Sequence, residues 1–178
     1  MLNVQQVTSA TVLPVLVSPD DRAYNEEHVL DGYFDGLAVG YAWGPPFGER
    51  LVTWSDLKRV GVSRRGLRRQ AASYLDAMVG RVRVHGQPPS LLLSFAGLES
   101  SVVLADGFWE RFARSIPGEL VIGVPARDVV IVTASSSASG LARARRAVDR
   151  VFFAGGPHLL LRDLLVRRRG QWVPYAAT

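Results

Sequence analysis

Cysteine is absent from this 178-residue sequence. Its absence excludes disulfide scaffolds, thiolate nucleophiles, iron–sulfur clusters and zinc sites built on cysteine. The three histidines, His28, His85 and His158, lie far apart in the sequence and form no paired metal-ligand motif. We therefore expect no metal site and no bound cofactor.

Long apolar runs and targeting signals are also missing. The longest runs, such as Leu91–Leu93, are far shorter than the ~20 residues that a membrane helix requires. Met1 is followed by neither a basic segment nor a long apolar segment, so no signal peptide is expected. These absences predict a cytoplasmic protein without membrane contact.

The residues that are present have an ordinary globular balance, with 48% hydrophobic and 21% charged. A domain of this length buries roughly two thirds of its unfolded surface and needs no disulfide or metal cross-link to be stable. We expect a flexible N-terminus at residues 1–9 and one domain over residues 10–178.

The charge is unevenly distributed. The basic residues are twenty arginines and one lysine, Lys58, and the net charge is +5. Residues 1–50 carry two basic and seven acidic side chains, whereas residues 51–178 carry nineteen basic and nine acidic ones. This division permits an anionic partner such as nucleic acid, and equally permits pairing within the fold or across a dimer.

The order of the expected elements indicates an α+β fold. Val12–Val17 is predicted to be a strand that either lies at a sheet edge or contains a bulge, because Pro14 cannot donate a backbone hydrogen bond. Helices are expected from Thr53, which forms a capping-box pattern with Asp56, and from Ser63, Asp106 and Leu141. The helix from Asp106 is expected to bury Phe108, Phe112 and Ile116, with Trp109 beside them. The further predicted strands are Leu37–Trp43, Arg81–His85, Leu91–Ala96, Glu119–Val124, Asp128–Ala134 and a last pair within Leu159–Tyr175. We predict a mostly antiparallel sheet with about three helices packed on it.

Four segments in succession resemble a known bacterial family. They are Val12–Val15, Val52–Leu57, Gly118–Val132 and Phe152–Gly156, with the sequences VLPV, VTWSDL, GELVIGVPARDVVIV and FFAGG. In this order they resemble the domain-of-unknown-function 1444 (YtpQ-like) family over most of residues 11–175. The resemblance implies a fold family and a bacterial cytosolic setting, and it transfers no catalytic residue. Some members carry a further N-terminal segment, which this chain is expected to lack.

Arginines cluster on two predicted helices. They are Arg64, Arg65, Arg68 and Arg69 on the first, and Arg143, Arg146 and Arg150 on the second. Guanidinium groups bind phosphate and carboxylate oxygens, so these faces are candidate anion- or nucleic-acid-binding surfaces. The alternative is a solvated helix face with pairs such as Arg145 and Asp149, because lysines and a stacking aromatic are missing from the basic faces.

Aromatic residues gather near the first predicted hairpin. Tyr41, Trp43 and Phe47 surround a Gly-Pro-Pro turn that is difficult to bury, and such rings are common anchors of protein interfaces. The leading hypothesis is therefore a non-catalytic accessory domain that binds a protein partner or a second copy of itself. Anion or nucleic-acid binding is the second hypothesis.

An unrecognised hydrolase is the third hypothesis. Ser135, Ser136 and Ser137 follow a predicted strand without a GxSxG motif. A catalytic set would need a pocket that joins His85 or His158 to a serine or an acid. The sequence identifies no catalytic residue, and Gly155 and Gly156 are expected to end a helix rather than cradle a phosphate.

Overall fold

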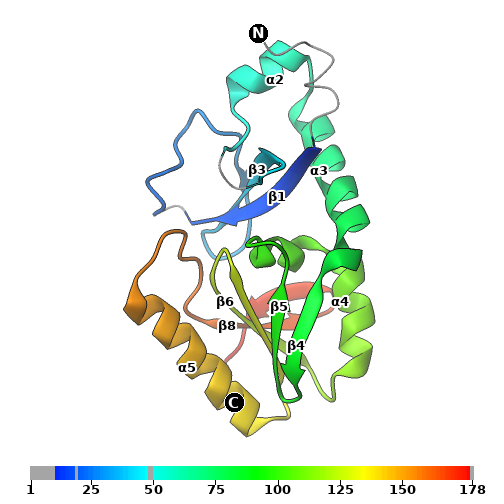
Figure 1. The fold of residues 1–178 in the computed structure, drawn as a ribbon, viewed down its shortest axis with the longest axis vertical. Helices are drawn as coiled ribbons and strands as arrows, with labels where there is room; N and C mark the ends of the chain where they lie inside the picture. Colours follow the sequence, from blue (N-terminus) through cyan, green and yellow to red (C-terminus); the bar gives the residue numbers. More distant parts are fainter. Residues whose placement is uncertain (1–10, 19, 48–49, 177–178) are drawn as a thin grey trace. The chain divides into compact units, whose positions relative to one another are not determined.

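The computed structural model describes residues 11–18, 20–47 and 50–176, and it has the predicted α+β fold with antiparallel sheets (Figure 1). The chain divides into two compact units, one ending at Met78 and one beginning at Val79. The predicted flexible N-terminus at residues 1–9 lies outside the described residues, and one domain over residues 10–178 stays a prediction.

The first unit contains a three-stranded antiparallel sheet in the order β1-β3-β2. Its strands are β1 (Thr11–Val17), β2 (Asp31–Gly32) and β3 (Ala38–Gly44). The position of β1 at the sheet's edge confirms the prediction made from Pro14, because a residue without an N–H group is tolerated there.

Two helices follow this sheet, α2 (Trp54–Val60) and α3 (Arg64–Met78). Helix α2 begins with the predicted capping box, in which the Thr53 hydroxyl accepts from the Asp56 N–H and the Asp56 carboxylate accepts from the Thr53 N–H. Helix α3 begins after Ser63, whose hydroxyl accepts from the N–H of Gly66. Its buried residues Leu67, Ala71 and Leu75 are one apolar face.

The second unit contains a six-stranded antiparallel sheet in the order β4-β5-β7-β6-β8-β9, which is larger than the sequence suggested. Its strands are β4 (Arg83–Gln87), β5 (Ser90–Ser94), β6 (Leu120–Ala126), β7 (Val129–Ala134), β8 (Leu164–Arg168) and β9 (Gln171–Pro174). Hairpins join β6 to β7 and β8 to β9, as predicted.

Helices lie on both faces of this sheet (Figure 1). Helix α5 (Ala138–Ala154) packs on β6 and β7. The opposite face carries the 3-10 helix η2 (Glu99–Leu104) and α4 (Asp106–Phe112). Two more 3-10 turns are η1 (Val79–Arg81) and η3 (Ala113–Ser115). Among the described residues, no helix is both long enough and apolar enough to span a membrane.

The side chain that α4 buries most deeply is not one of those predicted. Phe108, Phe112 and Ile116 were expected to be buried, yet they are only partly buried, and Trp109 is the fully buried ring. The indole N–H of Trp109 donates to the Val102 carbonyl at 2.7 Å. This bond satisfies the indole's one polar group, which makes its burial favourable.

Candidate functional site

The inner face of α5 fixes how the helix is oriented on the sheet. Ala144 and Val148 are each 1% exposed and belong to one core cluster with Leu164 of β8. Gly123 of β6 permits this close approach, because an added Cβ would lie 2.8 Å from a Val148 methyl group. A helix anchored along one side in this way presents a constant opposite side to solvent.

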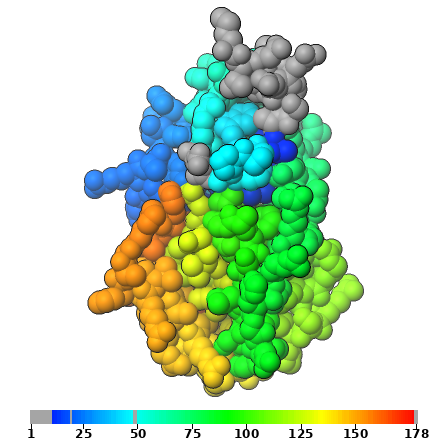
Figure 2. Space-filling view, in the orientation of Figure 1, coloured from blue at the N-terminus to red at the C-terminus, as the bar shows by residue number. Residues whose placement is uncertain are grey.

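That opposite side carries Arg143, Arg146, Arg150 and Phe153, which we call the α5 stripe. At 100° per residue, the four positions fall within an arc of about 80°. All four side chains are exposed, and Phe153 is 95% exposed. Figure 2 shows the yellow-to-orange segment of the chain, which contains α5, at the molecular surface. The predicted basic face on this helix is therefore accessible.

The three arginines of the α5 stripe have no ion pair or hydrogen bond among the described residues. The neighbouring Asp149 lies 3.7 Å from Arg162, and the described residues show no pair between Asp149 and Arg145, which the alternative interpretation had included. Arg145 lies instead over the ring of Tyr175, 6.0 Å from its centroid. Within the described part of this unit, the cations of the stripe therefore have no acidic partner.

Phe153 was missed as part of this surface. No stacking aromatic was expected on the basic faces, but Phe153 follows Arg150 by three residues on the same helical face. The helix continues to Ala154 before Gly155 ends it with a positive φ of 59°. A helical wheel extended by one residue would have revealed it.

The other predicted arginine cluster is partly used within the fold. In the first unit, Arg64 and Arg68 of α3 both pair with Asp31, which is 4% exposed. The Nε of Arg64 donates to the Asp31 carboxylate at 2.6 Å. The single carboxylate offsets only one of the two positive charges, and both arginine side chains stay about half exposed. Anion binding by Arg64 and Arg68 therefore stays a prediction, with less free charge than the sequence suggested, whereas Arg65 and Arg69 are exposed.

Tyr41 belongs to the same buried network. Its ring is 3% exposed and its hydroxyl donates a short hydrogen bond to Asp31. Burial and the neighbouring Asp31 carboxylate raise the pKa of the Tyr41 hydroxyl far above its ordinary value, so it stays protonated. Tyr41 is thus a core residue and offers no surface to a partner, which corrects its place among the predicted docking residues.

The two other rings of the predicted docking surface are only partly buried. Trp43 packs against the core of the first unit, together with Val39 and Val62. Phe47 lies over Gly44 and contacts the ring of Tyr74, with 5.6 Å between centroids. Protein docking through Trp43 and Phe47 stays a prediction that rests on less exposed surface than the sequence suggested.

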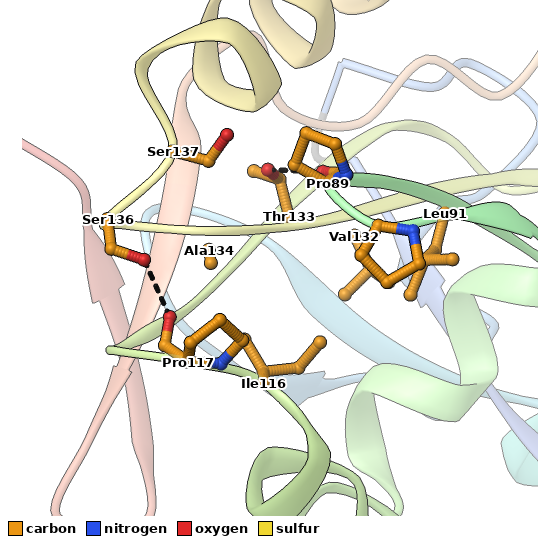
Figure 3. A pocket seen from close by; sticks show the side chains of 10 residues that line it. Pro89, Leu91, Ile116, Pro117, Val132, Thr133, Ala134, Ser136 and Ser137 are labelled. Atoms are coloured by element: carbon orange, nitrogen blue, oxygen red, sulfur yellow. Dashed lines mark hydrogen bonds between the residues drawn. The ribbon is translucent and has the colours of Figure 1, made fainter.

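The three serines considered for a hydrolase hold backbone groups. The Ser135 hydroxyl accepts from the Glu119 N–H, Ser136 donates to the Pro117 carbonyl, and the Ser137 hydroxyl accepts from Gly140 at the start of α5. Ser136 and Ser137 also line a pocket of about 60 Å³ (Figure 3). Its other lining residues are Pro88, Pro89, Leu91, Ile116, Pro117, Val132, Thr133 and Ala134. This apolar lining brings no histidine or acid to the serines.

Three buried polar residues that no sequence motif indicated lie in η2. Glu99, Ser100 and Ser101 are at most 6% exposed. One carboxylate oxygen of Glu99 accepts from the N–H groups of Phe95 and Gly97, while the other oxygen and both serine hydroxyls have no partner among the described residues. Successive residues of a 3-10 helix point about 120° apart, so these three side chains do not converge on one ligand. The described residues also contain no group of three or more His, Asp or Glu placed to hold a metal ion.

Comparison with known proteins finds one distant similarity of note. A UPF0354 protein of Listeria welshimeri is 25% identical over 133 residues, which cover 73% of this chain and 48% of that protein. The chain thus spans about half the length of this curated relative, whose name states no activity. No family model matches the chain, and no solved structure matches it. The similarity therefore links the chain to a bacterial protein without assigning a substrate.

Proposed function

We propose that this chain binds the phosphate backbone of nucleic acid through the α5 stripe. The observation that carries the proposal is the presence of three exposed arginines on one side of an anchored helix, none of which pairs with an acid among the described residues. Free guanidinium groups attract phosphates and release counterions from the polymer when they bind.

The spacing of the arginines suits neighbouring phosphates. Arg143 and Arg150 are seven residues apart, which is about 10 Å along a helix. Because their Cα atoms are held on a rigid element, only side-chain freedom is lost on binding. The excess of basic residues over acidic ones in residues 51–178 adds a long-range attraction for a polyanion.

The proposal is tested with the triple variant Arg143→Gln, Arg146→Gln and Arg150→Gln. Each exposed ion pair contributes up to about 1 kcal/mol, so the affinity for an oligonucleotide should fall about ten- to one-hundredfold. The slope of log K against log salt should lose about two units for a single strand, or about three for a duplex. Fluorescence anisotropy at several salt concentrations measures both quantities.

A matched control separates the stripe from the general charge of the protein. The control variant, Arg83→Gln with Arg111→Gln and Arg114→Gln, removes three exposed arginines from other elements of the same unit. It loses the same charge and should keep most of the binding. Equal losses in the two triple variants would contradict a site on α5.

We also infer that the chain belongs to the domain-of-unknown-function 1444 (YtpQ-like) family and acts in the bacterial cytosol. The four segments in succession and the similarity to a protein of Listeria welshimeri support this inference. Fractionation of cells that express the tagged protein checks the location. Recovery with the membrane or the periplasm would contradict it.

A further inference from the structure

Phe153 is a large apolar side chain that is almost fully exposed to solvent. Its ring is 95% exposed, whereas the adjacent Phe152 packs against the core cluster of the second unit and lies under the guanidinium group of Arg162. The two rings diverge because successive residues on a helix point about 100° apart. Phe153 therefore points the same way as the arginines of the stripe.

We propose that the α5 stripe binds single-stranded nucleic acid, with Phe153 as the platform on which one base stacks. This inference rests on the proposed function and adds the class of nucleic acid. Arginines that hold phosphates beside an aromatic ring that stacks on a base are the two components of single-strand binding surfaces. In a duplex the faces of the bases are covered by their neighbours, so only an unpaired strand can use the ring.

The surroundings of Phe153 leave room for a flat base. The next residues, Ala154, Gly155 and Gly156, are small and exposed. A Cβ added at either glycine would meet no atom within 4 Å. Arg143 and Phe153 are ten residues apart, or about 15 Å along the helix, so the stripe is long enough for a few nucleotides.

A membrane surface fits the same helix less well. A helix that lies on a bilayer inserts a broad apolar face, but the apolar face of α5 is buried against the sheet through Ala144 and Val148. Phe153 is the one large, exposed hydrophobic residue that α5 presents, and all of this helix is described. A single ring amid arginines favours stacking over insertion.

The test compares two probes of equal phosphate count in anisotropy titrations, an unstructured oligothymidylate and a short duplex. The variants are Phe153→Ala, Phe153→Leu and Phe153→Trp, beside the triple arginine variant. Loss of stacking on one base should weaken single-strand binding about five- to one-hundredfold in Phe153→Ala and Phe153→Leu. Phe153→Trp should keep or improve it, and duplex binding should change less than twofold in all three.

Each outcome separates this inference from the proposed function. If the triple arginine variant binds both probes as the parent does, the proposed function fails and this inference fails with it. If the arginines matter but Phe153→Leu binds the single strand like the parent, the stacking role fails alone. Vesicles containing phosphatidylserine serve as a third probe, and binding to them that depends on Phe153 and exceeds binding to the oligonucleotide would overturn the inference. Thermal melts should be unchanged in the Phe153 variants because the ring packs on nothing.

Discussion

The contribution of the buried Asp31 carboxylate to the free energy of unfolding can be measured directly. Asp31→Asn keeps the shape of the side chain and one acceptor oxygen, but removes the charge that holds Arg64 and Arg68. Breaking a fully buried ion pair costs about 3–5 kcal/mol. Here the two arginine side chains are 47% and 61% exposed, so water can solvate them. We therefore expect a smaller loss in the free energy of unfolding, about 2 kcal/mol.

Glu119→Gln is the matched control for this substitution. It also converts a carboxylate to an amide, and Glu119 also pairs with an arginine, Arg168, at 2.7 Å. Both partners of that pair are about half exposed, at 44% and 53%. Because the change in charge is the same, the difference between the two variants isolates the effect of burial. We expect Glu119→Gln to change the stability very little.

Urea unfolding followed by tryptophan fluorescence measures both variants. Trp43 and Trp54 report on the first unit, which contains Asp31. The variant Tyr41→Phe and the double variant Asp31→Asn with Tyr41→Phe complete a double-mutant cycle. The double variant should lose less free energy of unfolding than the sum of the two single losses, because the two groups share a hydrogen bond. An unfolding midpoint for Asp31→Asn equal to that for Glu119→Gln would refute the reasoning.

Two further predictions concern the first unit. Burial alone would raise the pKa of Asp56, but hydrogen bonds from Thr53 and the charge of Arg50 outweigh it and lower that pKa below its ordinary value of 3.8. The ionised Asp56 carboxylate stabilises the folded state fully above pH 3.8, and this contribution is lost as pH falls through the lowered folded-state pKa. Asp56→Asn lacks the titrating carboxylate. Its free energy of unfolding should therefore fall less than that of the parent between about pH 5 and about pH 2. Equal losses in urea midpoints would contradict this. The second is that Trp43→Ala with Phe47→Ala should lower the melting temperature by several degrees, because both rings pack on the first unit. An unchanged melting temperature would instead favour their use as docking anchors.

Local signals in the sequence were sufficient where neighbouring residues decide the structure. The capping box of Thr53 and Asp56 starts α2 as predicted, and Gly61 ends this helix with a positive φ of 69°. Pro14 predicted an edge strand or a bulge, and Gly155 ends α5. These features depend on backbone groups within a few residues, so a short stretch of sequence contains the necessary information.

Predictions about individual side chains were less successful where distant residues take part. Nothing near Arg64 and Arg68 in the sequence shows that both pair with Asp31, which lies more than thirty positions earlier. Tyr41 is of a residue type that often anchors interfaces, yet its position on β3 directs its side chain into the core, where its hydroxyl donates a hydrogen bond to Asp31. Trp109 is buried in place of Phe108 because the Val102 carbonyl accepts its indole N–H.

The sequence by itself determined the α+β class, the capping box of α2, the glycine that ends α5 and the single helical face that carries Arg143, Arg146 and Arg150. It could do so because helical periodicity and capping are local properties. It did not determine every helix start, because α5 begins at Ala138 rather than at Leu141, and the N-cap of α4 is Ala105 rather than Asp106. Only the tertiary structure decided which arginines are free, since this depends on whether an acid from a distant segment reaches them. It also decided that the side of α5 opposite the sheet carries both the free cations and Phe153, because packing of Ala144 and Val148 against β6 and β8 sets the direction in which the helix faces.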